Sequence, residues 1–277
     1  MRTAIVSHMH TTTSDGPWPD TLVDTLLGDL RAGAPPRILG ISGLQGTGKS
    51  TLATQVIAGA EARGLRGAVL SLDDLYFDHD VRAALARDVH PLLATRGPPG
   101  THEVDLGLSV FEAVRDRRPV QLPRFDKLGD RRLPVDAWPT VQALDLLVFE
   151  GWCVGTPPEP AAQLVEPLNA LERDEDAAGT WRRWCNAALA RDYPALGGAM
   201  DRLLFLQPPG FDVVFDWRLQ QEQALQAAAP GRPGMDAAGI ARFVQHYERI
   251  SRQALRTLPD RADVVLPLDA QRRVVAG

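Results

Sequence analysis

Short apolar runs alternate along the chain with segments of helical periodicity. Five runs are typical of buried strands, at 37–42, 67–74, 144–152, 201–207 and 262–268. The segments between them carry apolar residues at helical spacing, at 49–63, 78–94, 105–115, 160–173, 179–191, 212–228 and 236–257. This alternation predicts an α/β fold of three layers, α/β/α, with a parallel sheet of about five strands covered by helices on both faces.

The length of 277 residues predicts a single domain over 1–277. Residues 1–18 are polar and aperiodic, which is typical of a flexible tail, and the apolar spacing within 19–33 predicts an N-terminal helix. We expect a helical lid region within the domain at about 175–235. The Pro/Gly-rich stretch at 229–234 is a candidate hinge or lid edge.

Composition narrows the classes of partner. A net charge of -5 argues against a general nucleic-acid binder, and no apolar run is long enough to span a membrane. The first residues lack the apolar centre of a signal peptide, and the two cysteines match no metal or redox spacing. We therefore expect a cytoplasmic protein that acts on a small molecule, without a nucleic-acid or membrane partner. The sequence leaves the oligomeric state open.

The segment GLQGTGKS at 43–50 fits the P-loop pattern G-x-x-x-x-G-K-[ST] and lies between a predicted strand and a predicted helix. Its glycines let backbone N–H groups curl around phosphate oxygens at a helix N-terminus. Lys49 is expected to reach the β- and γ-phosphates as a catalytic group, and the Ser50 hydroxyl to coordinate Mg²⁺. The predicted ATP-binding residues are Gly43, Leu44, Gln45, Gly46, Thr47, Gly48, Lys49, Ser50 and Thr51.

Acidic residues stand at the ends of two predicted strands. Asp73 and Asp74 end the strand at 67–74, and Glu150 lies near the end of the strand at 144–152. Ligands of parallel sheets bind beyond the carboxyl ends of the strands. A kinase needs one carboxylate to accept the proton of the acceptor hydroxyl and another on the magnesium side. Asp73 is the candidate base and metal ligand, Glu150 a second catalytic and metal-side group, and Asp74 a supporting residue or helix cap.

The order of several motifs resembles the plant-type D-glycerate 3-kinase family, which is similar in turn to the uridine kinase, phosphoribulokinase and pantothenate kinase group. The matching segments, within about 37–257, are GLQGTGKST, SLDDLYF, RGPPGTHEVD, PRFDK…GDR, LVFEGW and VVFDWRLQQEQAL. The resemblance implies an ATP- and Mg²⁺-dependent kinase that converts D-glycerate to 3-phosphoglycerate. It also implies that Asp73 is the base, that Glu150 is the acid of an E-G-W segment and that PRFDK lies on the acceptor side.

Two departures from that family bear on the acceptor. Leu75 stands where the family has Phe, and only Leu128 separates PRFDK from the following Gly-Asp-Arg, where the family has a longer loop. A nucleoside, pantothenate or another sugar acid therefore remains an alternative acceptor. A non-catalytic ATP-binding regulatory protein is a further alternative, which acceptor-dependent turnover would distinguish.

A small anionic acceptor needs cationic or hydrogen-bonding side chains around it. The candidate acceptor residues are Asp74, Tyr76, Arg96, His102, Arg124, Lys127 and Arg131. We expect RGPPGTH, at 96–102, to form a stiff acceptor-side loop, with His102 either a donor to the acceptor or a structural histidine. Arg182 and Arg218, on predicted helices, are candidates for a lid residue that neutralises the migrating phosphoryl charge.

Overall fold

Five parallel strands form the centre of the computed structural model, which describes residues 18–275 except 29, 32, 36 and 229–233. In their order across the sheet, the strands are β2 (Gly67–Ser71), β7 (Leu146–Gly151), β1 (Arg37–Gly43), β8 (Arg202–Gln207) and β9 (Val264–Pro267). The predicted three-layer α/β fold with a five-stranded parallel sheet is confirmed. The first seventeen residues of the expected tail and most of the expected hinge at 229–234 lie outside the described residues.

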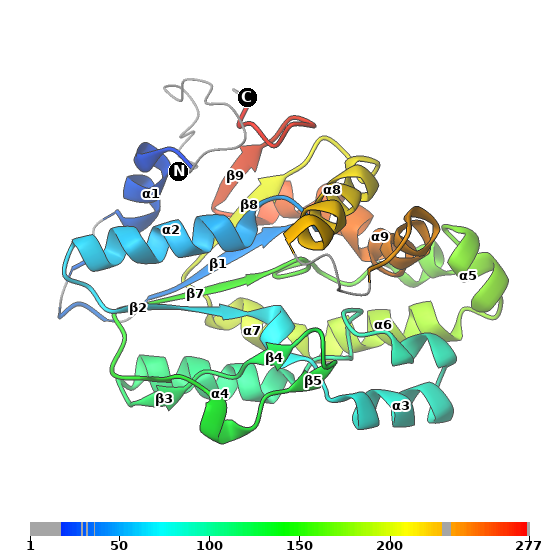
Figure 1. Ribbon diagram of the computed structural model, residues 1–277, viewed down its shortest axis with the longest axis horizontal. Coiled ribbons are helices and arrows are strands. Elements are labelled where there is room, and N and C mark those ends of the chain that lie inside the picture. Colours follow the sequence, from blue (N-terminus) through cyan, green and yellow to red (C-terminus); the bar gives the residue numbers. More distant parts are fainter. Residues whose placement is uncertain (1–17, 29, 32, 36, 229–233, 276–277) are drawn as a thin grey trace.

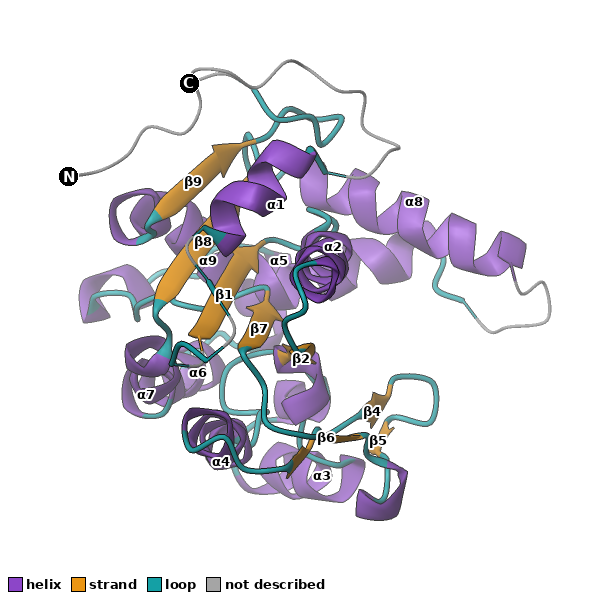
Figure 2. Ribbon diagram, turned by 90° about the vertical axis from the view of Figure 1, so that its left-hand side faces the viewer, coloured by secondary structure: helices purple, strands orange, loops and turns teal. Residues whose placement is uncertain are grey.

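Helices cover both faces of the sheet (Figures 1 and 2). One face packs against α1 (Asp20–Leu27) and α2 (Lys49–Ala62), and the other against α4 (Val104–Arg115), α7 (Tyr193–Ala199) and α9 (Ala237–Arg261). Residues of β1 alternate between the two hydrophobic cores, because successive side chains of a strand point to opposite faces. The sheet is therefore buried on both sides.

The remaining elements surround this sandwich. The other helices are α3 (His79–Asp88), α5 (Ala170–Glu175), α6 (Thr180–Arg191) and α8 (Val213–Ala228). Short two-stranded pairs join β3 (Val120–Gln121) to β6 (Thr140–Val141) and β4 (Phe125–Asp126) to β5 (Arg131–Arg132). Single 3₁₀ turns are η2 (Leu72–Leu75), η3 (Pro91–Ala94), η4 (Val135–Ala137) and η5 (Ala161–Leu164). No helix among the described residues combines the length and the apolar character needed to cross a membrane.

Several predicted boundaries are corrected by local chemistry. The helix expected over 78–94 divides at Val89, because Pro91 starts a separate 3₁₀ turn. The strand expected over 67–74 ends at Ser71, whose hydroxyl caps the following 3₁₀ turn. The helix expected over 19–33 ends at Leu27, before Gly28 with φ 49°.

The helix expected over 160–173 is interrupted, because the chain forms only the turn η5 and the start of α5 there, and a buried ion cluster ties this segment to α9. The Arg249 guanidinium donates to Glu159 Oε2 at 2.9 Å and to Glu172 Oε2 at 2.6 Å. Glu172 has no exposed surface, and Arg249 is 8% exposed. Arg249 also donates to the carbonyls of Gln163 and Glu166, and the first of these could not accept a helical hydrogen bond from residue 167, which is a proline.

Replacement of Arg249 tests how much the ion cluster contributes to the stability of the fold. Arg249→Met should lower the free energy of unfolding by about 3–5 kcal/mol, because the buried carboxylate of Glu172 loses its cationic partner and Glu159 keeps only Arg256. Urea denaturation measures this change. Arg242→Met is the matched control, since Arg242 forms a similar pair with Glu175 that is exposed on both sides, and it should cost less than about 1 kcal/mol. Equal losses in the two variants would contradict the assigned role.

Candidate active site

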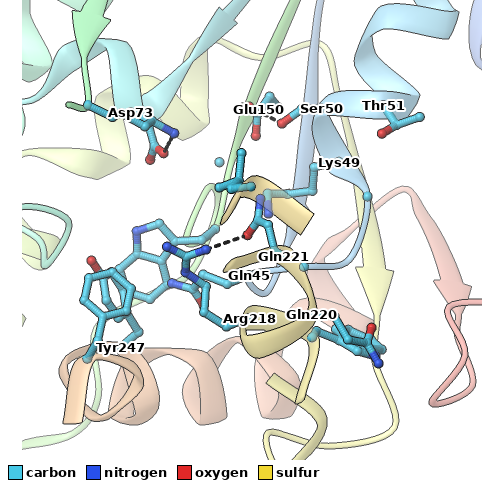
Figure 3. Close-up of a pocket in the computed structure, with 18 of the residues that line it drawn as sticks. Gln45, Lys49, Ser50, Thr51, Asp73, Glu150, Arg218, Gln220, Gln221 and Tyr247 are labelled. Atoms are coloured by element: carbon cyan, nitrogen blue, oxygen red, sulfur yellow. Dashed lines mark hydrogen bonds and ion pairs between the residues drawn. The ribbon is translucent and has the colours of Figure 1, made fainter. Parts of the chain in front are cut away.

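The carboxyl ends of β1, β2 and β7 bring the predicted phosphate-binding and acidic segments to one edge of the sheet. In the strand register, Glu150 lies opposite Ile41 on one side and Ser71 on the other. The P-loop follows β1 at this edge, and Asp73 follows β2. These segments line a cavity of about 550 Å³, together with residues of α8 and α9 (Figure 3).

The P-loop forms a tight backbone turn between β1 and α2. Gly46 and Gly48 have φ values of 83° and 87°, which favour glycine, and a Cβ on Gly46 would lie 2.7 Å from the Cβ of Trp217. The Thr47 hydroxyl donates to the carbonyl of Leu44 at 2.8 Å and closes the turn from inside. The turn therefore presents its backbone N–H groups at the N-terminus of α2, an arrangement that favours phosphate.

The two functional side chains of the P-loop lie inside the cavity. Lys49 Nζ donates to the carbonyl of Leu44 at 3.1 Å, and the Ser50 hydroxyl donates to Glu150 Oε1 at 3.0 Å. Burial lowers the pKa of Lys49, although the carboxylates of Glu150 and Asp73 act in the opposite direction. Glu150 is itself 6% exposed. The hydroxyl and carboxylate oxygens here are the donor type that Mg²⁺ prefers.

Asp73 faces the P-loop from across the cavity, as Figure 3 shows. Its Oδ1 accepts a hydrogen bond from the Tyr76 hydroxyl at 2.5 Å, and its Oδ2 lies 2.5 Å from Lys127 Nζ. Burial alone would raise the pKa of Asp73. The charge and hydrogen bond of Lys127, with the hydrogen bond from Tyr76, outweigh burial and hold that pKa below its usual value of 3.8. Asp73 is therefore a carboxylate at neutral pH.

Arg96 joins the 96–102 loop to the β4–β5 hairpin and also lines the cavity. Its guanidinium pairs with Asp130, donates to the carbonyl of Lys127 at 2.9 Å and lies over the ring of Phe125. The carboxylate of Asp130 also accepts from the buried Arg82 at 2.6 Å. The short connection after PRFDK is thus the turn of a hairpin that two arginines hold against the rest of the site.

The structure places His102 behind the cavity wall. His102 is 3% exposed, its ring lies 4.9 Å from the ring of Tyr76, and its Nδ1 lies 2.5 Å from the hydroxyl of Tyr193. Burial lowers the pKa of His102 to about 4, although Asp73 acts in the opposite direction, so the ring is neutral at physiological pH. It supports Tyr76, and it is not among the residues that line the cavity.

Four more predicted residues lie away from the cavity. Asp74 caps the turn after β2, accepts from the backbone N–H of Phe125 and pairs with Arg124 at 3.4 Å. Arg131 is exposed on β5. Arg182 is 2% exposed and donates to Asp176 and to the carbonyls of Leu164 and Val165. The lid role expected for Arg182 is not supported, because these buried contacts occupy its guanidinium.

Arg218 lies at the cavity, as the prediction for a lid residue requires. It extends from α8, bonds to Gln221 at 3.0 Å and stacks over the ring of Phe243 (Figure 3). Sequence reasoning missed several other lining residues, which come from α8, α9 and the C-terminal segment: Gln220, Gln221, Leu225, Phe243, Tyr247 and Arg272. The α8 residues among them are exposed ones, and the apolar periodicity of the helix does not indicate that they meet the cavity.

Comparisons with known proteins agree with this geometry. No protein-family model matches the chain. A relative from Schizosaccharomyces pombe, described as "Uncharacterized kinase mug58", is 34% identical over 230 residues, which are 76% of this chain and 78% of the relative. The chloroplastic D-glycerate 3-kinase of Arabidopsis thaliana is 28% identical over 267 residues, which are 87% of this chain. The match spans only 54% of that plant protein.

The structure is also similar to that of a solved kinase. D-glycerate 3-kinase from Cryptococcus neoformans superimposes with a TM-score of 0.72 and 27% identity, and the match covers 91% of this chain and 94% of the fungal one. The sheet, P-loop and strand-end carboxylates of this chain are those of a P-loop kinase, and such a site binds a nucleotide. The chain therefore belongs to the P-loop kinase family that includes D-glycerate 3-kinase, and it is a phosphotransferase with an alcohol group as acceptor.

Proposed function

We propose that the protein transfers the γ-phosphoryl group of ATP to a hydroxyl of D-glycerate, giving 3-phosphoglycerate. The observation that carries the proposal is the carboxylate of Asp73, held between Lys127 and Tyr76 in the cavity that contains the P-loop. A base, an acceptor-side cation and a phosphate cradle thus line one cavity. This is the arrangement that in-line phosphoryl transfer to a small anionic alcohol requires.

The nucleotide side uses the residues after β1. Backbone N–H groups of the P-loop would bind the phosphates, and Lys49 would neutralise charge on the β- and γ-oxygens. Mg²⁺ would be held by the Ser50 hydroxyl, with Glu150 and Asp73 on its coordination side. The described residues contain no group of three or more His, Cys, Asp or Glu side chains that could hold a metal alone. Phosphate and water oxygens would therefore complete the coordination, as is usual for Mg²⁺.

The acceptor side offers two cations, Arg96 and Lys127. The carboxylate of glycerate would lie between them, which directs a hydroxyl of the same small molecule toward Asp73. As the bond from the hydroxyl oxygen to phosphorus forms, Asp73 would accept the hydroxyl proton and ADP would leave. Arg218, on α8 beside the P-loop, would neutralise charge on the transferring group.

Two aromatic residues of the cavity, Tyr76 and Trp152, favour a small acid over a nucleoside. Tyr76 and Trp152 are each 4% exposed, the first bonded to Asp73 and the second to the carbonyl of Gly97. Little of either ring remains open for a base to stack on. Charge therefore dominates the acceptor side, and this supports glycerate or a similar hydroxy acid.

Asp73→Asn tests the proposed base. The amide keeps the shape and accepts no proton, so kcat for D-glycerate-dependent ADP release should fall by about 10²–10⁴-fold. Asp74→Asn is the matched control, because the neighbouring carboxylate caps a turn outside the cavity, and kcat should stay within about threefold of wild type. Full activity of Asp73→Asn would contradict the role of Asp73 as the base.

Arg96→Gln tests recognition of the acceptor charge. Loss of the guanidinium should raise the KM for D-glycerate by about tenfold or more and leave the KM for ATP nearly unchanged. Arg124→Gln is the control, since this neighbouring arginine pairs with Asp74 away from the cavity.

The identity of the acceptor is tested on the wild type, with uridine and pantothenate as alternative acceptors in the ADP-release assay. Turnover with either of them, and none with D-glycerate, would overturn the substrate and keep the enzyme class.

Lys127→Gln tests the cause of the low pKa of Asp73. Removing the ammonium removes the main influence that lowers this pKa, so the acid limb of the kcat/KM profile should move to higher pH. In the wild type we expect this limb to lie below the usual carboxyl pKa, so that activity falls only in strong acid. Arg131→Gln removes an exposed cation of the same hairpin and should leave the limb in place. If the acid limb of the kcat/KM profile stayed in place in Lys127→Gln, the result would contradict the effect of Lys127 on the pKa of Asp73.

A further inference from the structure

The segment after β9 forms a tight turn that returns to the P-loop. Asp269 holds this C-terminal turn closed, because its Oδ1 accepts from the backbone N–H groups of Gln271 at 2.8 Å and Arg273 at 2.9 Å. Between them, Arg272 has φ 63°, a left-handed value that residues other than glycine rarely adopt. Such conformations persist where surrounding contacts impose them, and they concentrate at functional sites. The placement of the Arg272 side chain depends on this backbone shape.

The guanidinium of Arg272 joins the P-loop to helix α8. Its Nε donates to the carbonyl of Gly46 at 2.7 Å, and its Nη2 donates to Gln220 Oε1 at 3.1 Å. Its central carbon lies 4.9 Å from the centre of the Trp217 ring, which is within cation–π distance. One side chain thus contacts the backbone of the phosphate-binding turn and two residues of α8.

Trp217 forms the second part of the same junction. Its side chain is 1% exposed, and its indole Nε1 donates to the carbonyl of Ala270, in the C-terminal turn, at 2.8 Å. Its Cβ lies against Gly46, where an added Cβ would approach it to 2.7 Å. The P-loop, α8 and the C-terminal turn therefore meet at Trp217 and Arg272. Because the contacts are close, a displacement of one of the three disturbs the other two.

The bond to Gly46 bears on phosphate binding through the geometry of one peptide. The C=O of a trans peptide and the N–H of the following residue point in opposite directions. The carbonyl of Gly46 is turned toward Arg272, so the N–H of Thr47 points into the turn, where its nitrogen lies 3.3 Å from the carbonyl oxygen of Leu44. Inward N–H groups of this turn are the donors for phosphate oxygens. Arg272 thus holds one of these donors in the direction that an anion requires.

The junction also bears on Arg218, the next residue of α8. Arg218 lines the active-site cavity, while Trp217 beside it is anchored to the C-terminal turn. Successive residues of a helix lie about 100° apart around its axis, so the anchored side of the helix sets the direction in which Arg218 leaves it. Gln220 bonds to Arg272, and its neighbour Gln221 bonds to Arg218 (Figure 3). A rotation or tilt of α8 would therefore move Arg218 within the cavity.

We propose that Arg272 is a positioning residue that fixes α8 and the P-loop relative to each other, so that the N–H of Thr47 faces the phosphates and Arg218 faces the transferring group. The role at the P-loop requires only that a nucleotide binds there. The role at Arg218 rests on the proposed function, because it concerns the phosphoryl transfer itself. Nucleotide affinity and turnover therefore test the two roles separately.

Calorimetric titration with Mg·ADP tests the role at the P-loop. Arg272→Gln should weaken Mg·ADP binding about tenfold, because the Gly46 carbonyl loses its donor. Arg272→Lys keeps the charge but lacks the planar fork that reaches Gly46 and Gln220 at once, so its affinity should fall by a similar factor. Arg273→Gln is the matched control, since this neighbouring arginine pairs with Asp269 and does not line the cavity. Its affinity should stay within about twofold of wild type.

Two results of this titration would overturn the role at the P-loop. Unchanged affinity in Arg272→Gln would show that the bond to Gly46 does not affect nucleotide binding. Affinity lost in Arg272→Gln and fully kept in Arg272→Lys would indicate that the residue only neutralises phosphate charge, without positioning the turn. Neither result depends on the identity of the acceptor.

A double-mutant cycle on kcat tests the role at Arg218, at saturating ATP and with D-glycerate or whichever acceptor supports turnover. Arg272→Gln should lower kcat about tenfold in the wild type and less than about threefold in the Arg218→Gln background, because the group that it positions is already absent there. Equal factors in the two backgrounds would indicate a general structural loss and contradict the role at Arg218. Turnover of another acceptor in place of D-glycerate would reject only the proposed substrate.

Discussion

The register of three parallel strands is the constraint on which the active site depends. Glu150 of β7 lies opposite Ile41 of β1 and Ser71 of β2, so the segments that follow these strands emerge at the same edge. Side chains of β1 alternate between two hydrophobic cores. A slip of one residue would turn every apolar side chain of a strand to the wrong core, and the buried faces therefore hold the register. This positions the P-loop, Asp73 and Glu150 around one cavity.

The acceptor side depends on a different kind of constraint, a set of ion pairs between loops. Lys127 reaches Asp73 from a hairpin 54 residues further along the chain. That hairpin is held by Asp130, which binds Arg82 and Arg96 at once. The short connection between PRFDK and the following Gly-Asp-Arg departs from the family pattern, yet it folds as a complete turn with Asp130 at φ 52°. In this arrangement the cavity has two cations beside its base.

The sequence predicted the parts of the site that adjoin regular structure. The P-loop pattern has its own backbone geometry, and Asp73 and Glu150 stand where buried strands end, so their meeting follows from the parallel sheet. The acceptor residues were harder to predict, because they lie in loops whose paths tertiary contacts decide. Of that set, Tyr76, Arg96 and Lys127 line the cavity, while Asp74, His102, Arg124 and Arg131 lie behind or beside it. Arg182 was a candidate lid residue because it lies on a predicted helix, but its side chain is buried and paired with Asp176.

By itself, the sequence determined the class of fold, the phosphate-binding turn and the two carboxylates at the strand ends. These follow from local pattern, since apolar periodicity, glycine positions and strand ends are readable over a few residues. Only the tertiary structure decided which arginine faces the cavity, which histidine is buried and how the hairpin meets the 96–102 loop. Such choices depend on contacts between residues far apart in the chain, and no local pattern contains them.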